Sequence, residues 1–265
     1  MMQLSYIIVA HDEGGMLRTA ALSVMEAARA SRVAVEWSAN APLTLQIVMV
    51  LDNADVTTRT VAEAIEAECR SPAMRRWVDV SVVESSFGEP GSARNAGLSA
   101  ATGEIVGILD GDDLVGKLFV QKSLARLVEQ SRTQPVADIR AVLHPEPLLY
   151  FGTKTLVWRQ PSHAEYESRK AALVHTNLWD VTLIAPRAVL EEHPFVAARV
   201  AEGTGYEDWE WSLSSSLEGI RHDIVPDTFC YKRSKRVSRF TRDNFHSVLI
   251  PTDRIDVSKL VRSRG

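Results

Sequence analysis

An apolar run of the chain ends in three carboxylates, Asp110, Asp112 and Asp113, in the segment ILDGDDL. Acids so close together at the end of a buried strand are costly unless a positive charge neutralises them. Mg²⁺ and Mn²⁺ take carboxylate oxygens together with water and substrate phosphates. Asp110 and Asp112 therefore suit a divalent cation that carries a diphosphate. The alternative is an exposed Asp-Gly turn that binds nothing.

Acids also follow the first two apolar runs of the chain, with Asp12 and Glu13 after the first and Asp52 and Asp55 after the second. In open α/β sheets, ligands bind beyond the carboxyl ends of the strands. If these runs are neighbouring parallel strands, their acids and those of the ILDGDDL segment meet on one oxygen-rich, electronegative rim.

The elements that must position these acids alternate between apolar runs and helical patterns, which predicts βαβ units around a mainly parallel sheet. In the first half we expect strands over 4–10, 43–51, 78–84 and 104–109, and helices over 20–30, 57–70 and 93–101. In the second half we expect strands over 148–158 and 179–184, and helices over 186–192 and from about 206.

The composition of the 265 residues is that of an ordinary globular protein, 45% hydrophobic and 24% charged, with a net charge of −4. Nothing in this balance favours nucleic acid as a partner. Two cysteines give no disulfide framework, and no apolar stretch is long enough to span a membrane, which predicts a cytoplasmic protein. A basic tract over 232–242 is either a solvated or phosphate-binding loop, which we favour, or a peripheral membrane contact.

The segment EPGSARNAGLSAATGEIVGILDGDD resembles the central motif of the family 2 glycosyltransferases. The matching positions are Ala93, Arg94, Asn95, Gly97, Ala101, Gly103, Leu109, Asp110, Asp112 and Asp113. Downstream, GYEDWEWSLSSSLEG is similar to the family's Glu-Asp-Trp segment. The matches of IIVAHDE and VLDNADVTT are looser. Together these motifs run from about residue 4 to residue 238.

The resemblance implies a GT-A fold, which is a Rossmann-like α/β fold with a mixed, mainly parallel sheet flanked by helices and a smaller acceptor-side subregion. Residues 1–115 would form the nucleotide-sugar-binding half and residues 116–240 the acceptor-binding and catalytic half of the same domain. Residues 241–265 would be a tail or a connector.

The resemblance also implies an enzyme that transfers a sugar, with inversion, from a nucleoside-diphosphate sugar to a hydroxyl of a glycan or lipid-linked acceptor in the synthesis of bacterial surface polysaccharide. The favoured nucleotide is UDP, because Asp52 would accept a hydrogen bond from N3 of uracil, although guanine also offers an N–H donor. His11, Glu13 and Arg94 would line the base pocket. Two of these residues have a plainer alternative: His11 as a polar strand end, and Arg94 in a surface pair with Glu89.

On the diphosphate, Asp112 would ligate Mn²⁺ or Mg²⁺, and Asp110 would contact the ribose or a water on that metal. A second positive charge would come from the basic tract, for which Lys232, Arg233, Lys235 and Arg236 are candidates. Ser234 stands where the family often has a histidine, so His222 and His246 are the substitutes for a third metal ligand.

For the chemical step, Asp208 would be the general base, with Glu207 and Trp209 on the acceptor side. Acids in the first turn of a helix are favoured by its dipole in any case, and Trp209 and Trp211 could belong to the core. Asn95 could cap a helix or contact a ligand. Residues 150–205 should hold further acceptor contacts, among which the candidates are Trp158, His163, His175, Asn177, Trp179 and Asp180.

Other classes of protein fit less well. Asp110 with Asp112 nearly matches the nucleophile motif of haloacid-dehalogenase-like phosphohydrolases, but that motif normally follows the first strand of its fold. No Gly-x-Gly-x-x-Gly follows the first strand, which disfavours a dinucleotide-dependent oxidoreductase. A sugar-nucleotide-binding domain without catalysis is the third alternative, and the two sets of acids argue against it.

Overall fold

The computed structural model describes residues 3–34, 43–167, 176–199 and 202–236. The predicted tail or connector over 241–265 lies outside these residues, as do His175 and His246.

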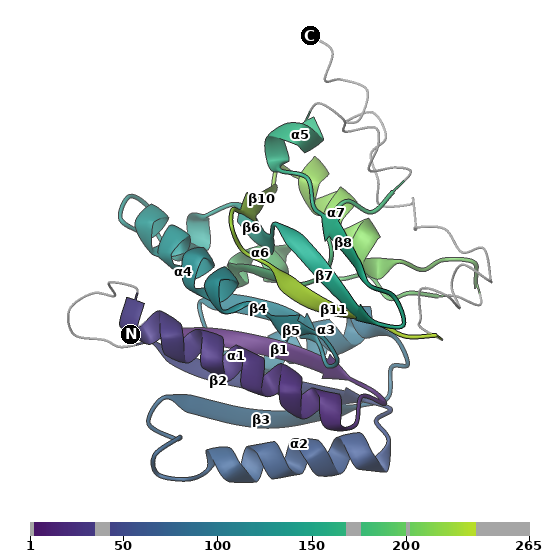
Figure 1. Ribbon diagram of the computed structural model, residues 1–265. Helices are drawn as coiled ribbons and strands as arrows, with labels where there is room; N and C mark the ends of the chain where they lie inside the picture. The colour runs from purple at the N-terminus through teal and green to yellow at the C-terminus, as the bar shows by residue number, and fades with distance from the viewer. Residues whose placement is uncertain (1–2, 35–42, 168–175, 200–201, 237–265) are drawn as a thin grey trace.

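A mixed, mainly parallel sheet of seven strands forms the centre of the molecule, in the order β10-β6-β9-β4-β1-β2-β3 (Figure 1). The strands β4, β1, β2 and β3 run parallel, β10 runs parallel to β6, and β9 runs antiparallel to β4 and β6. Their bounds are β1 (Gln3–Ala10), β2 (Thr44–Asp52), β3 (Val78–Ser85), β4 (Ile105–Asp110), β6 (Ala141–Pro145), β9 (Leu183–Pro186) and β10 (Arg221–Val225). The predicted α/β class and the first four strands are confirmed.

Helices cover both faces of this sheet (Figure 1), so the central strands are mostly apolar and buried. On β1, Tyr6 and Ile8 pack with α1 and α4, whereas Ile7 packs with α3, α6 and α7 on the other face. The helices are α1 (Gly15–Ala34), α2 (Val56–Cys69), α3 (Pro90–Ala100), α4 (Lys117–Ser131), α5 (His163–Glu167), α6 (Arg187–Glu192) and α7 (Glu207–Leu217), with a short 3₁₀ turn at Val136–Asp138.

Local signals set where the helices beside the rim begin. Asp55 caps α2 by accepting a hydrogen bond from Thr58 N at 2.7 Å. Glu89 caps α3 through Gly91 N and Ser92 N, and Pro90 is its first residue, so this helix begins three residues before the predicted 93.

Within α3, Gly97 allows a close approach to the sheet, because a Cβ at this position would lie 2.4 Å from Ile7 Cγ2. The helix that carries the Ala-Arg-Asn motif is thereby held directly against β1 and β2.

The second half departs most from the predictions. The predicted strand over 148–158 is wrong, because the chain forms the antiparallel strands β7 (Pro147–Gly152) and β8 (Leu156–Arg159), with Gly152 at φ +99° where the chain turns. These strands join β5 (Leu114–Val115) and β11 (Cys230–Ser234) in a smaller sheet, in the order β5-β11-β7-β8. The predicted strand over 179–184 starts too early, since β9 begins at Leu183.

The fifteen-residue helix α4 was not predicted. It begins after Gly116, which makes no side-chain capping hydrogen bond, so the usual polar signal for a helix start is missing. The helices predicted over 186–192 and from about 206 are present as α6 and α7.

Candidate active site

The three acidic strand ends lie next to one another, because β4, β1 and β2 are neighbouring parallel strands. Gly111 N donates to Val9 O at 2.8 Å, which ties the loop after β4 to the end of β1. His11 N donates to the Glu13 carboxylate, and His11 Nδ1 lies 2.8 Å from Asp52 O. The first two strands therefore present His11, Glu13 and Asp52 at a single edge of the sheet.

Asp52 is buried, with 6% of its surface exposed. Its Oδ1 accepts hydrogen bonds from Phe87 N at 2.6 Å and Ser85 Oγ at 3.0 Å. These bonds from β3 and the loop after it set the direction in which the carboxylate points.

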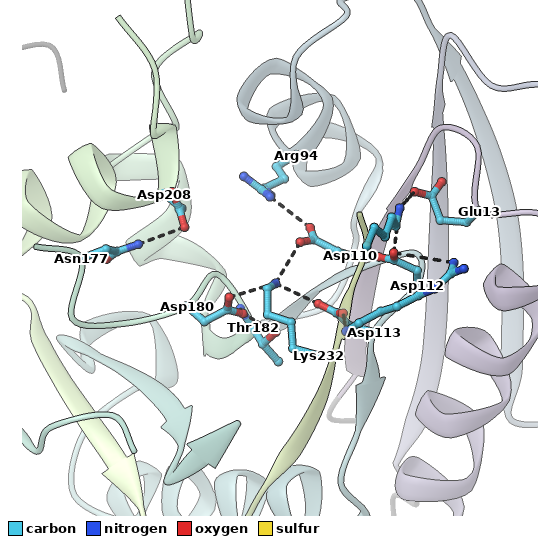
Figure 2. Close-up of polar contacts among 12 residues, drawn as sticks. Glu13, Arg94, Asp110, Asp112, Asp113, Asn177, Asp180, Thr182, Asp208 and Lys232 are labelled. Carbon is cyan, nitrogen blue, oxygen red and sulfur yellow. Dashed lines mark hydrogen bonds and ion pairs between the residues drawn. The ribbon is translucent and has the colours of Figure 1, made fainter. Parts of the chain in front are cut away.

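Lys232, on β11, lies at the centre of the site (Figure 2). Its Nζ lies 2.9 Å from Asp113 Oδ2, 2.9 Å from Asp180 Oδ2 and 3.3 Å from Asp110 Oδ2. Burial alone would lower the pKa of this lysine, but the three carboxylates raise it well above its ordinary value. One charge that neutralises Asp110 within the protein is therefore a partly buried ammonium.

Arg94, on α3, is the second cation on Asp110. Its Nη2 lies 3.0 Å from Asp110 Oδ1, and its Nη1 lies 2.7 Å from Glu207 Oε1. Burial would raise the pKa of Asp110, but Lys232 and Arg94 outweigh it and hold that pKa well below its usual range. Burial and three like-charged neighbours, Asp110, Asp112 and Asp180, raise the pKa of Asp113 to about 8 despite Lys232.

The alternatives for two residues of the Ala-Arg-Asn motif are settled by these contacts. Arg94 does not pair with Glu89, which caps α3. Asn95 is neither a cap nor turned toward the acidic rim, because its side chain bonds to both the N–H and the carbonyl of Phe195.

Lys235 and Arg233 face the other side of the acidic loop. Lys235 Nζ lies 2.7 Å from Asp112 Oδ2 and 3.4 Å from Glu13 Oε1, and an Arg233 nitrogen lies 3.9 Å from Asp112 Oδ2. Burial raises the pKa of Glu13, against the lowering effect of the His11 N–H and Lys235. Arg236 is exposed, and with Arg233, Lys235 and Asp12 it lines a cavity of about 360 Å³.

Two adjacent acids at the start of α7 differ sharply in their surroundings. Glu207 is 6% exposed and is held by Arg94. Asp208 is half-buried, and its Oδ2 accepts a hydrogen bond from Asn177 Nδ2 at 3.0 Å (Figure 2). Burial and the neighbouring Glu207 raise the pKa of Asp208 to about 7, against the lowering effect of Arg94.

The tryptophans divide between core and surface. Trp179 is fully buried and stacks on His222 with ring centroids 4.5 Å apart, so it presents no surface to an acceptor and the predicted contact is not supported. Trp211 is also in the core. Trp209 is partly buried, with its ring centroid 5.8 Å from that of Tyr206.

The sequence of this chain matches the family described as glycosyl transferase family 2 over residues 5–192. The chain belongs to this family. No curated protein matches the sequence.

Solved structures give the fold of this family 2 glycosyltransferase as GT-A. S. aureus TarS 1-349 in complex with UDP-GlcNAc has a TM-score of 0.60 and 18% identity, covering 91% of this chain and 61% of that one. The mannosyltransferase PcManGT from Pyrobaculum calidifontis, in complex with GDP-Man and Mn²⁺, has a TM-score of 0.55 and 18% identity, with coverages of 90% and 59%. The chain thus spans about three fifths of the length of these two proteins.

Histidine does not complete a metal site in the described part of this glycosyltransferase. Both ring nitrogens of His222 have buried partners, His144 Nε2 at 3.0 Å and Ser215 Oγ at 3.0 Å, so the proposed role as third ligand does not hold. Among residues 3–34, 43–167, 176–199 and 202–236, no three metal-binding side chains are clustered with a suitable geometry. In the same residues no helix is long and apolar enough to cross a bilayer.

Asp113, Asp180 and Asn177 contribute to the site more than the sequence suggested. Asp113 carried a signal, since it is the third acid of the ILDGDDL segment. Asp180 and Asn177 lie in a stretch with few motifs, where the sequence does not distinguish them from the other candidates. Only the contact of Asp180 with Lys232 and that of Asn177 with Asp208 identify them.

Proposed function

We propose that this family 2 glycosyltransferase is an inverting enzyme that moves a sugar from a nucleoside-diphosphate sugar, UDP being favoured, to a hydroxyl of a glycan or lipid-linked acceptor. Its place would be in the cytoplasm, with bacterial surface polysaccharide as the product class. The observation that carries the proposal is the contrast between Glu207, which is locked in a buried ion pair, and Asp208, which is half-buried with a pKa of about 7.

Asp208 fits the requirements of a general base. A base works best when its pKa lies near the operating pH, and a carboxylate paired with a guanidinium is too weak a base for the task. Asp208 would take the proton from the acceptor hydroxyl while that oxygen attacks the anomeric carbon. The bond from this carbon to the diphosphate would break on the opposite side, which inverts the configuration.

The donor would lie along the edge formed by β1, β2 and β4. Asp52, oriented by Ser85 and Phe87, would accept from the base, with His11 and Glu13 beside it. Arg233, Lys235 and Arg236 would stabilise the charge that develops on the leaving diphosphate, since they line one cavity at the end of β11. Arg94 is buried in ion pairs, so we assign it to holding Asp110 and not to lining the base pocket.

The donor atoms in this region fit a divalent cation. Asp110 and Asp112 supply carboxylate oxygens, the ligand type that Mg²⁺ and Mn²⁺ prefer, and substrate phosphates and water complete such sites. When bound, the metal would neutralise the diphosphate as it leaves. Asp112 is the better ligand of the two, because Asp110 is already held by both Arg94 and Lys232.

The haloacid-dehalogenase-like alternative is not supported. Its nucleophile must be free to attack a phosphate, whereas both oxygens of Asp110 are engaged, one by Arg94 and the other by Lys232. A non-catalytic binding domain has no use for Asp208, a half-buried acid of raised pKa beside the site.

A donor screen tests the proposal. The protein is mixed with UDP-GlcNAc, other UDP-sugars and GDP-Man, each with and without Mn²⁺, and its melting temperature is recorded. A ligand that binds only the folded state raises that temperature, so at least one nucleotide sugar should give a metal-dependent increase. Release of the nucleoside diphosphate, with an anomerically inverted product by NMR, completes the test. A product that retains the donor configuration, or stabilisation by no nucleotide sugar, would contradict the proposal.

A further inference from the structure

The side chain of Asn177 has its orientation set from both ends. Its Oδ1 accepts the N–H of Trp179 at 3.4 Å, which turns its Nδ2 toward Asp208 Oδ2 at 3.0 Å. An ionised carboxylate only accepts hydrogen bonds, so the amide nitrogen is the group that must face it. Asn177 therefore donates to Asp208 in a fixed direction (Figure 2).

The segment that carries Asn177 is anchored in the core. Trp179 is fully buried, and its Nε1 donates to Pro161 O at 2.9 Å. Asp180 N donates to Gln160 Oε1 at 2.7 Å, and Gln160 Nε2 in turn donates to Pro145 O at 2.7 Å. Two buried side chains, those of Trp179 and Gln160, thus hold the backbone at the peptide that Asn177 uses and directly after it.

This anchored segment reaches both parts of the site. Asn177 contacts Asp208 at the start of α7, and three residues later Asp180 contacts Lys232, which pairs with Asp110. The segment is thus a rigid connection between the acid on the acceptor side and the acids of the rim.

We propose that Asn177 is the positioning residue of the general base, holding the Asp208 carboxylate through one oxygen so that the other faces the acceptor. This inference rests on the proposed function, since it assigns Asn177 a role only if Asp208 is the base. The other oxygen of Asp208, Oδ1, accepts the N–H of Trp209 at 2.9 Å, which further restricts rotation of the carboxylate, and its second lone pair remains to accept the proton of the acceptor hydroxyl. Asn177 itself takes and gives no proton in the reaction.

The effect of the Asn177 amide on the pKa of Asp208 can be separated from a purely structural effect. Asp208 faces Glu207 on its own helix, Arg94 from α3, Asp180 from the anchored segment and Lys232 from β11. Burial and the two acids favour its protonated form, whereas Arg94, Lys232 and the Asn177 amide favour the ionised form. Removal of the amide should therefore raise the titration midpoint of Asp208.

The experiment follows this midpoint without any substrate. The carboxyl carbons of aspartate are labelled with ¹³C in the full chain, and the Asp208 signal is assigned by its loss in Asp208→Asn. The midpoint should rise in the order wild type, Asn177→Ala, Asn177→Asp, because the first variant removes a donor and the second, of the same shape, adds a like charge. Loosening of the segment alone would move the two variants equally, and that result, or no movement at all, overturns the proposal.

Turnover gives the second arm, with the nucleotide sugar that stabilises the protein best. Loss of one hydrogen bond to a charged group should lower kcat in Asn177→Ala by about 10- to 100-fold, and raising the pH should recover part of this loss. In the Asp208→Asn background the same substitution should have no further effect. Full activity of Asp208→Asn would overturn the assignment of Asp208 as the base. If Asp208→Asn is inactive but the Asp208 midpoint is unchanged in both Asn177 variants, only the positioning role of Asn177 is overturned.

Discussion

Arg94 Nη1 lies 2.7 Å from Glu207 Oε1, in an ion pair in which both side chains are almost fully buried. The pair joins α3, which follows β3, to α7, which lies more than a hundred residues later. The same guanidinium holds Asp110, so one side chain connects the acids of the rim to the helix that carries Asp208. Its loss removes the buried partner of Glu207 and leaves Asp110 with Lys232 as its remaining cation.

The first prediction concerns the stability of this connection. Arg94→Met should lower the free energy of unfolding by about 3–5 kcal/mol, because breaking one side of a buried pair leaves an uncompensated charge. Chemical denaturation measures the change. Arg187→Met is the control, since its pair with Glu191 is largely exposed and should contribute less than about 1 kcal/mol. Equal losses of unfolding free energy in the two variants would show that the buried ion pair contributes no more to stability than the exposed one.

The second prediction separates the two acids at the start of α7. Asp208→Asn should lower kcat by about two to four orders of magnitude, the usual contribution of a general base, while donor binding stays close to that of the wild type. Calorimetry with the nucleoside diphosphate and steady-state kinetics measure the two effects. Glu207→Gln should act mainly on stability through Arg94. If only KM changes in Asp208→Asn, the residue binds the acceptor and is not the base.

A third prediction is the pH dependence that follows from the pKa of Asp208, which is raised to about 7. The base must be ionised, so kcat should rise with pH through about 7 and then level. The same shift has the opposite sign for stability. The native state keeps a proton on Asp208 that the unfolded chain releases at about pH 4. The stability that Asp208 contributes is therefore fully present below that pH and is lost as the pH rises through about 7.

Denaturation curves across this pH range check the stability effect. Between about pH 5 and about pH 8, the free energy of unfolding should fall less in Asp208→Asn than in the wild type. An unchanged slope would mean that Asp208 has an ordinary pKa in the folded protein.

The fourth prediction concerns the metal and Lys235, whose Nζ lies 2.7 Å from Asp112 Oδ2. An ammonium at this distance competes with a divalent cation for the same oxygen. Lys235→Met should therefore tighten Mn²⁺ binding in the absence of nucleotide, and Asp112→Asn should abolish it. Calorimetry with MnCl₂ measures both. Lys122→Met removes the same charge at a distant pair with Asp227 and should leave Mn²⁺ binding unchanged. Weaker binding in Lys235→Met would show that the lysine does not compete.

A fifth prediction follows from the burial of Trp179. Trp179→Ala should cost about 3–5 kcal/mol of stability, as large-to-small changes in a core do. Trp209→Ala, at a partly buried position, should cost less and act on the KM for the acceptor. Denaturation and kinetics of the two variants distinguish these outcomes. If Trp179→Ala has normal stability and a raised KM for the acceptor, Trp179 belongs to the acceptor site after all.

The sequence alone determined the features that depend on local pattern. Apolar runs that end in acids located β1, β2 and β4 and their shared rim, because a strand buried on both faces must be apolar and must end where polar groups begin. The Ala-Arg-Asn and Asp-x-Asp motifs identified the family for the same reason, since their residues lie close together in the chain. By contrast, α4 lacked a polar start signal and was missed.

Only the tertiary structure decided which charges meet. Lys232 reaches Asp110 across 122 positions and Arg94 reaches Glu207 across 113, and such contacts depend on packing and not on spacing. The same packing buries Trp179 but leaves Trp209 partly exposed, although the sequence does not distinguish these two tryptophans. It also leaves Asp208 accessible beside the ion-paired Glu207, although these two acids are adjacent in the chain. Burial and neighbouring charge set the chemistry of a side chain, and both arise only when the chain has folded.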